Sequence, residues 1–151
     1  MRTALTKILG TRTVVLGAIL AGSLMFNSLA NPAEKTETQV QIPATSEAIW
    51  QSIDKETEQL GRIIQAGKLE EVHHLAFAIR DLVAALPARS ASLPADKLTQ
   101  VKANSKFVAT LAERLDATGD AKDKAGTESN FQKLKGVLKT IRANYAGSGQ
   151  K

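Results

Sequence analysis

The segment from residue 70 to residue 87, EEVHHLAFAIRDLVAALP, holds the densest group of side chains capable of chemistry. It contains both histidines of the chain, His73 and His74. In a helix, Glu70 lies one turn from both of them, at i,i+3 and i,i+4. A carboxylate and two imidazoles at this spacing can bind Zn²⁺, Ni²⁺ or Cu²⁺, so Glu70, His73 and His74 form a candidate divalent-metal site. The alternative is an ordinary solvated helix face without a metal.

Catalytic and cofactor motifs are missing from the sequence. A di-iron bundle needs a second Glu-x-x-His pair on another helix, and there is no third histidine. There is also no G-x-S-x-G, no phosphate loop and no H-E-x-x-H. The absence of cysteine excludes thiolate metal sites, a C-x-x-C-H haem site and a cysteine nucleophile. We therefore expect a protein that is not an enzyme and carries no resident cofactor.

A second stripe runs along the same predicted helix, beside its apolar face. His73, Phe77 and Arg80 fall at i, i+4 and i+7, and Asp81 follows Arg80. Phe77 is the unusual member, because a phenylalanine seldom points to solvent. Three interpretations are open for this stripe. It packs against a neighbouring helix with Arg80 paired to an acid, it binds a partner or a second copy of the chain, or it forms a small-ligand site around Arg80.

A single amide lies within the apolar arc of a later predicted helix. Asn104 stands between Val101 and Val108 in that arc. A buried amide needs hydrogen-bond partners, since leaving it unpaired costs about 1–3 kcal/mol. We expect Asn104 to be a structural polar residue of the core, bonded locally or fixing helix register, in preference to a ligand-binding role.

Four helical segments must position these residues. Apolar side chains recur at helical spacing between breakers, and the predicted helices cover residues 46–66, 68–86, 95–118 and 128–145. Thr127 is the expected cap of the last helix, and GDAKDKAG (119–126) is expected to be a polar loop. No useful stretch alternates with period two. The pattern predicts an all-α, up-down-up-down antiparallel four-helix bundle over residues 46–146.

The first thirty residues have the three parts of a secretory signal. Three basic residues and no acidic one open the chain: Arg2, Lys7 and Arg12. An apolar run follows over residues 14–26, and Ser28 and Ala30 supply the small side chains before a cleavage site. We predict a signal peptide over residues 1–30, cleavage after Ala30 and a periplasmic or secreted protein. Residues 31–45 and 147–151 are expected to be disordered. A retained membrane anchor is the less favoured alternative, because the apolar run is shorter than the roughly 20 residues of a span.

Removing this leader changes the charge and the chemistry. The chain has 20 lysines and arginines against 15 acids; cleavage leaves 17 against 15, a net charge of +2, which argues against nucleic acid as a partner. Both methionines, Met1 and Met25, lie in the leader, so Met/His haem ligation is excluded. One basic run remains after Glu128, comprising Lys133, Lys135, Lys139, Arg142 and Lys151. It is either a solvated helix face and tail or a weak site for anionic surfaces.

Three segments carry a resemblance to a known group of proteins: residues 70–87, KFVATLAERLDATGD (106–120) and GTESNFQKLKGVL (126–138). Here the chain resembles small, uncharacterised, exported bacterial helical proteins associated with heavy-metal efflux loci. Its architecture is also similar to cytochrome b562 and cytochrome c′, without their haem ligands. The export signal, the helix pattern and the lack of catalytic groups predict a non-enzymatic protein that acts by binding a protein partner or itself, and the resemblance suggests an accessory role in metal efflux or envelope stress. The alternative is a divalent-metal carrier or sensor that uses Glu70, His73 and His74.

Overall fold

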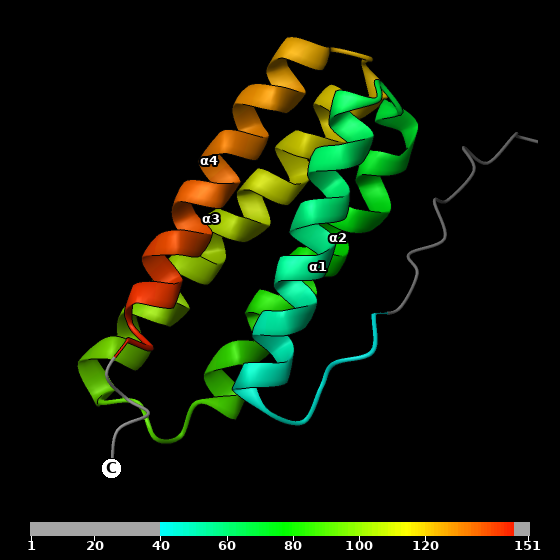
Figure 1. The fold of residues 1–151 in the computed structure, drawn as a ribbon. Helices are drawn as coiled ribbons and strands as arrows, with labels where there is room; N and C mark the ends of the chain where they lie inside the picture. Colours follow the sequence, from blue (N-terminus) through cyan, green and yellow to red (C-terminus); the bar gives the residue numbers. More distant parts are fainter. Residues whose placement is uncertain (1–39, 147–151) are drawn as a thin grey trace, which may run out of the picture. The chain divides into compact units, whose positions relative to one another are not determined.

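The computed structural model describes residues 40–146, and the described part of the chain is an all-α four-helix bundle (Figure 1). The predicted signal peptide, residues 31–39 and the C-terminal tail lie outside the described residues. The chain divides into two units, 1–34 and 35–151, and every described residue belongs to the second. The elements, in order, are α1 (Ser46–Gln65), η1 (Leu69–Glu71), α2 (Val72–Ala85), η2 (Leu86–Arg89), α3 (Ala95–Asp120) and α4 (Lys124–Ala143), where η denotes a 3₁₀ helix.

The predicted fold class is confirmed. Both ends of α1 form where the local residue types predict them. The side chain of Thr45 caps α1 by accepting a 3.2 Å hydrogen bond from the backbone N–H of Ala48. Gly67, at φ 74°, takes the left-handed conformation that ends the helix. The second predicted helix, over residues 68–86, is divided in the structure. The 3₁₀ helix η1 precedes α2, and the segment containing Pro87 forms the 3₁₀ helix η2. Proline has no N–H to continue an α-helix.

The predicted loop over residues 119–126 is wrong. Helix α3 continues to Asp120 and α4 begins at Lys124. Asp123, not Thr127, caps α4, since its side chain accepts a 2.9 Å hydrogen bond from the N–H of Gly126. Thr127 lies buried inside the helix. The turn uses Lys122 at φ 54°.

Gly119 stays within α3 for a packing reason. A Cβ added at Gly119 would lie 2.8 Å from the backbone carbonyl oxygen of Leu69 and 3.3 Å from Cβ of Val72. Glycine therefore allows α3 to approach η1 and the start of α2 closely. Its sequence signal resembles that of a helix stop, but its role is close contact between elements.

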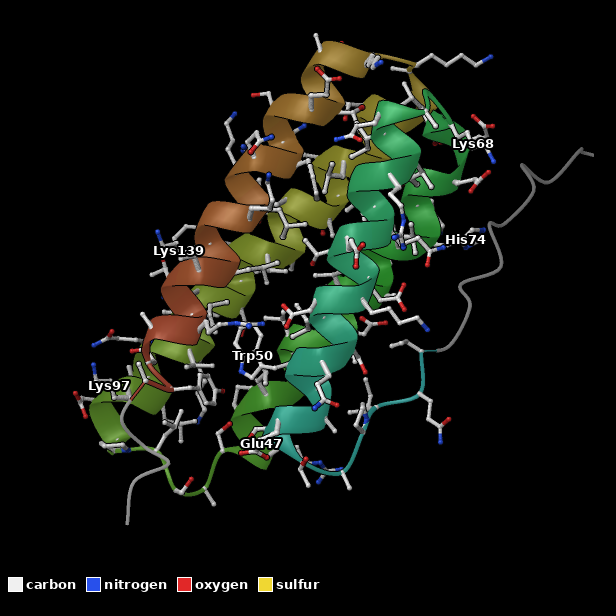
Figure 2. The ribbon with its side chains drawn as sticks, viewed as in Figure 1. Glu47, Trp50, Lys68, His74, Lys97 and Lys139 are labelled. Carbon is white, nitrogen blue, oxygen red and sulfur yellow. The ribbon has the colours of Figure 1, made fainter. Side chains whose placement is uncertain are left out.

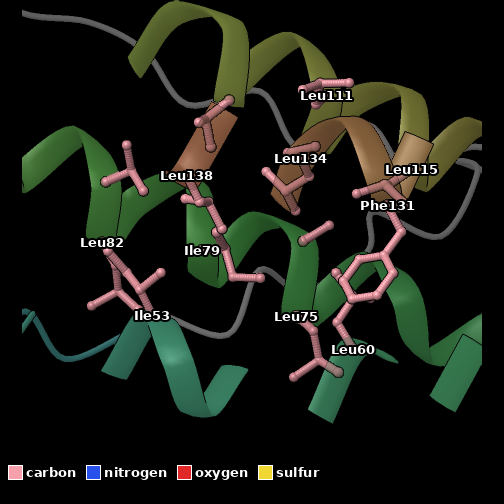
Figure 3. Packing of buried hydrophobic residues seen from close by; sticks show 14 of the residues in the cluster. Ile53, Leu60, Leu75, Ile79, Leu82, Leu111, Leu115, Phe131, Leu134 and Leu138 are labelled. Atoms are coloured by element: carbon pink, nitrogen blue, oxygen red, sulfur yellow. The ribbon is translucent and has the colours of Figure 1, made fainter. Parts of the chain in front are cut away.

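The core is made by the apolar stripes of all four helices, which meet in one cluster (Figure 3). Burying each such side chain contributes about 1.5–3 kcal/mol. The fully buried large residues are Ile49, Ile53, Leu60, Ile64, Ile79, Leu82, Leu86, Leu115, Leu134, Ile141, Val72 and Val83. Val40 and Ile42 are half-buried against this cluster, so the described end of the segment expected to be disordered is packed.

The four seams between neighbouring helices differ in how extensively the two helices contact each other. Helices α1 and α2, α2 and α3, and α3 and α4 contact each other extensively, whereas α1 and α4 contact each other much less. The bundle is consequently loosely packed along the seam between its first and last helices. None of the helices within residues 40–146 is both long and apolar enough to cross a membrane.

Candidate functional site

The predicted stripe on α2 faces α3 at its histidine end. His73 is buried, and its Nδ1 lies 2.9 Å from Oδ1 of Asp116 on α3. Its Nε2 is buried and has no hydrogen-bond partner among the described residues. Both ring nitrogens are thus enclosed in the α2–α3 seam.

The other members of the stripe stack on one another. The His73 and Phe77 rings are 4.6 Å apart, and the Arg80 guanidinium lies 4.2 Å from the Phe77 centroid. Nε of Arg80 donates a 2.7 Å hydrogen bond to Asp81. Phe77 is half-buried and packs against the core cluster. Of the three interpretations of the stripe, this geometry fits helix packing best.

The candidate metal ligands do not converge on one point. Glu70 and His74 are exposed, while His73 is buried. The His74 ring stands edge-on to the His73 ring at 5.2 Å. Within residues 40–146, no group of three or more histidine, aspartate or glutamate side chains is placed to hold a metal ion.

The expectation that Asn104 belongs to the core is wrong. Asn104 is half-buried, and its Nδ2 donates a 2.9 Å hydrogen bond to the carbonyl of Gln100 one turn back. The local bond was one of the expected outcomes, but Asn104 itself is not enclosed by the cluster, although Val101 and Val108 on the same face are fully buried. The buried asparagines are Asn130 and Asn144 on α4 and at its end.

The loosely packed α1–α4 seam holds a groove that motif searching does not find. Three adjoining pockets of about 440, 420 and 230 Å³ lie along it. Lys135 lines all three, and each neighbouring pair shares further residues. We call these pockets together the α1–α4 groove. The third pocket, which we call the Trp50 pocket, is lined by Trp50, Ile53, Asp54, Thr57, Lys135, Leu138, Lys139 and Arg142.

Trp50 connects the two walls of the groove. Figure 2 shows its side chain extending from α1 towards α4, and Arg142 lies 4.4 Å above its ring. Arg142 also pairs with Asp54. On its other side Trp50 meets the edge of Tyr145 at 5.7 Å. The indole is 9% exposed, yet its Nε1 has no hydrogen-bond partner among the described residues, and neither has the buried Oγ1 of Thr57.

Tyr145, which contacts Trp50, lies just after the end of α4. Its hydroxyl lies 2.8 Å from Oγ of Ser90, which itself donates a 2.6 Å hydrogen bond to the carbonyl of Leu86. Burial raises the pKa of the Tyr145 phenol above its ordinary value of 10.0, and the hydrogen bond with Ser90 opposes that rise.

The acidic side chains along the groove have ion-pair partners, whereas two of its lysines have none within the described residues. The acids that line it each have a basic partner, in the pairs Asp54–Arg142, Glu58–Arg62 and Glu128–Lys124. Lys135 lies 5.0 Å from the Phe131 ring. Neither Lys135 nor Lys139 forms an ion pair within the described part of the chain. The groove therefore carries uncompensated positive charge on its α4 wall.

The signal for this groove was present in the sequence only as the basic run after Glu128, which does not reveal what faces it. The arrangement offers an apolar floor, two buried polar atoms without partners among the described residues and two ammonium groups without an ion pair there. No protein-family model, curated protein or solved structure matches this chain.

Proposed function

We propose that this protein is exported, is not an enzyme and acts by binding, with the α1–α4 groove as its binding site. The observation that carries the proposal is the run of three adjoining pockets along the one loosely packed seam of the bundle. Ligand sites commonly lie between the helices of bundles, where an apolar floor carries a few polar groups. The stripe on α2 is less suited, because His73 is buried against Asp116 of α3 and Arg80 is engaged by Asp81 and Phe77 of its own helix.

The site of action in this proposal is the periplasm or the cell exterior. The support is the basic, apolar and small-residue order of residues 1–30. The resemblance to proteins of heavy-metal efflux loci supports an accessory role in metal efflux or envelope stress. Mass spectrometry of the protein from its native host tests export. A mature mass that begins at Asn31 agrees with the proposal, and an intact leader contradicts it.

Binding at the groove is tested by native mass spectrometry. The purified protein is mixed with a small-molecule extract of the host envelope, desalted and weighed. We expect an adduct on the wild type that is lost in Ser129→Phe, which fills the first pocket. The matched control is Ala103→Phe on the exposed surface of α3, which lines none of the three pockets. An adduct that persists in the Ser129 variant contradicts the assignment to the groove.

The divalent-metal alternative has its own experiment. Calorimetry with Zn²⁺, Ni²⁺ and Cu²⁺ compares the wild type with a His73→Ala/His74→Ala double variant. Our proposal expects equal, weak heats in both proteins, because His73 lies buried with Nδ1 bonded to Asp116. Tight binding that the double variant loses would favour a metal carrier that uses Glu70, His73 and His74.

A further inference from the structure

We infer that the Trp50 pocket binds the head group of a small amphipathic organic anion, such as an apolar carboxylate. This inference rests on the proposed function of the α1–α4 groove and names its ligand class. The apolar part of the ligand would lie on the groove floor, and its anionic oxygens would face Lys135, Lys139 and the polar atoms at Trp50 and Thr57.

Two buried polar atoms call for an oxygen acceptor at this place. The indole Nε1–H can only donate a hydrogen bond, whereas the Thr57 hydroxyl can donate or accept. Both atoms are buried without a partner among the described residues, and both residues line the same pocket. A buried donor without an acceptor is costly, and natural structures keep few of them. A carboxylate oxygen is a suitable acceptor for either group.

The charge around the pocket selects an anion over a neutral or cationic ligand. Asp54 is the single acid lining the Trp50 pocket, and it pairs with Arg142. Lys135 and Lys139 remain unpaired within residues 40–146. A cation would meet two ammonium groups with no free carboxylate, while an anion would gain charge-assisted hydrogen bonds.

The floor and the size of the pocket require a ligand with an apolar part. Ile53 and Leu138 are 1% and 7% exposed and form the floor. At about 230 Å³ the Trp50 pocket is the smallest of the three. It admits a head group and a short chain, and the two adjoining pockets along the groove can accept a longer tail.

Titration with three ligands of equal tail length tests the ligand class. Trp50 is the only tryptophan of the chain, so intrinsic fluorescence reports on this pocket directly. Octanoate, octanamide and octyltrimethylammonium are added separately to the full protein. We expect a saturable fluorescence change with octanoate at least about tenfold tighter than with either of the others. Equal affinity for octanoate and octanamide overturns the anion assignment while leaving binding at the groove intact.

Charge variants locate the head group. Lys135→Gln and Lys139→Gln should each weaken octanoate binding severalfold, and the double variant by roughly tenfold. Lys133→Gln is the matched control, because Lys133 is exposed on the same helix and lines none of the three pockets. Equal affinity in the double variant and the control overturns the inference. Thermal unfolding of each variant confirms that it folds.

A vesicle arm separates a free anion from a lipid surface. Anionic phosphatidylglycerol vesicles are added in place of octanoate, and sedimentation measures binding. Binding to vesicles without saturable binding of octanoate overturns the inference. If no tested ligand binds and the native protein carries no envelope adduct, the proposed function fails together with it.

Discussion

The α2–α3 seam at His73 and the α1–α4 groove at Trp50 contain the same kinds of groups in different packing. In each, an arginine lies over an aromatic ring, Arg80 over Phe77 and Arg142 over Trp50. Each also has a buried ring nitrogen without a hydrogen-bond partner in the described part of the chain. The His73 side is closed by a hydrogen bond to Asp116 across the seam, whereas the Trp50 side opens into a pocket.

A dense group of reactive side chains does not by itself make a site. On α2 the groups stack on one another, and His73 Nδ1 is bonded to Asp116 of the neighbouring helix, while Nε2 has no partner in the described part of the chain. Helices α1 and α4 contact each other much less, and the exposed ammonium groups of Lys135 and Lys139 on this seam form no ion pair within the described residues. Five predictions, given in order of decreasing expected effect, bear on this difference.

The close packing of α3 against η1 and the start of α2 depends on Gly119. Gly119→Ala should destabilise the protein by about 2 kcal/mol, because the added Cβ would meet the backbone oxygen of Leu69 at 2.8 Å. Gly136→Ala is the control, since nothing lies within 4 Å of its Cβ position on exposed α4. It should stabilise the helix by about 0.5–1 kcal/mol. Urea denaturation measures both, and a stabilising Gly119→Ala would show that this contact is not tight.

The hydrogen bond across the closed seam should contribute to stability. Asp116→Ala should cost about 1.5 kcal/mol, since it leaves His73 Nδ1 buried without this partner. Glu113→Ala, at an exposed position on the same helix, should change stability by less than about 0.5 kcal/mol. Thermal denaturation at neutral pH compares the two. Equal effects would mean that the seam holds without the His73–Asp116 contact.

The indole nitrogen in the open groove should contribute little to stability. Trp50→Phe should cost under about 1 kcal/mol, because the ring still packs against Arg142 and Tyr145 while the lost N–H had no partner among the described residues. Chemical denaturation followed by circular dichroism measures the change. A loss above about 2 kcal/mol would contradict an unsatisfied Nε1. Calorimetry should show weaker octanoate binding in the same variant.

The smallest effect concerns the phenol of Tyr145 beside Trp50. Tyr145 is the only tyrosine, so near-ultraviolet titration reports its pKa alone. Ser90→Ala should raise that pKa further, because the hydrogen bond with Ser90 lowers it and burial remains. An unchanged or lower pKa in this variant would contradict the contact.

The same phenol gives a stability signature with a defined sign. Its pKa is raised in the folded state, so above pH 10.0 the unfolded chain releases the proton first. The contribution of Tyr145 to stability is therefore complete below pH 10.0 and declines as the pH rises towards the folded pKa. Tyr145→Phe should remove this decline, measured as the difference between wild-type and variant urea midpoints. Parallel midpoints across that range would contradict it.

The sequence by itself determined the helices and the core. Stripes such as Ile49, Ile53 and Leu60 have a 3.6-residue period that only a helix can place on one face, and Thr45 and Gly67 mark the ends of α1 through local backbone chemistry. The sequence-based prediction was wrong at residues whose type has more than one structural role. Gly119 and Thr127 carry the signals of a stop and a cap, but a contact with η1 and burial in α4 override them.

Only the tertiary structure decided which polar groups are satisfied. Helical periodicity tells which residues share a face, but the neighbour opposite that face depends on how closely two helices pack. Asp116 contacts His73 although the two residues are more than forty positions apart in the sequence. On the loosely packed α1–α4 seam, Nε1 of Trp50 and Oγ1 of Thr57 have no hydrogen-bond partner in the described bundle. The free energies that set these distances come from packing the whole core, so no local pattern of charges or aromatic residues can report them.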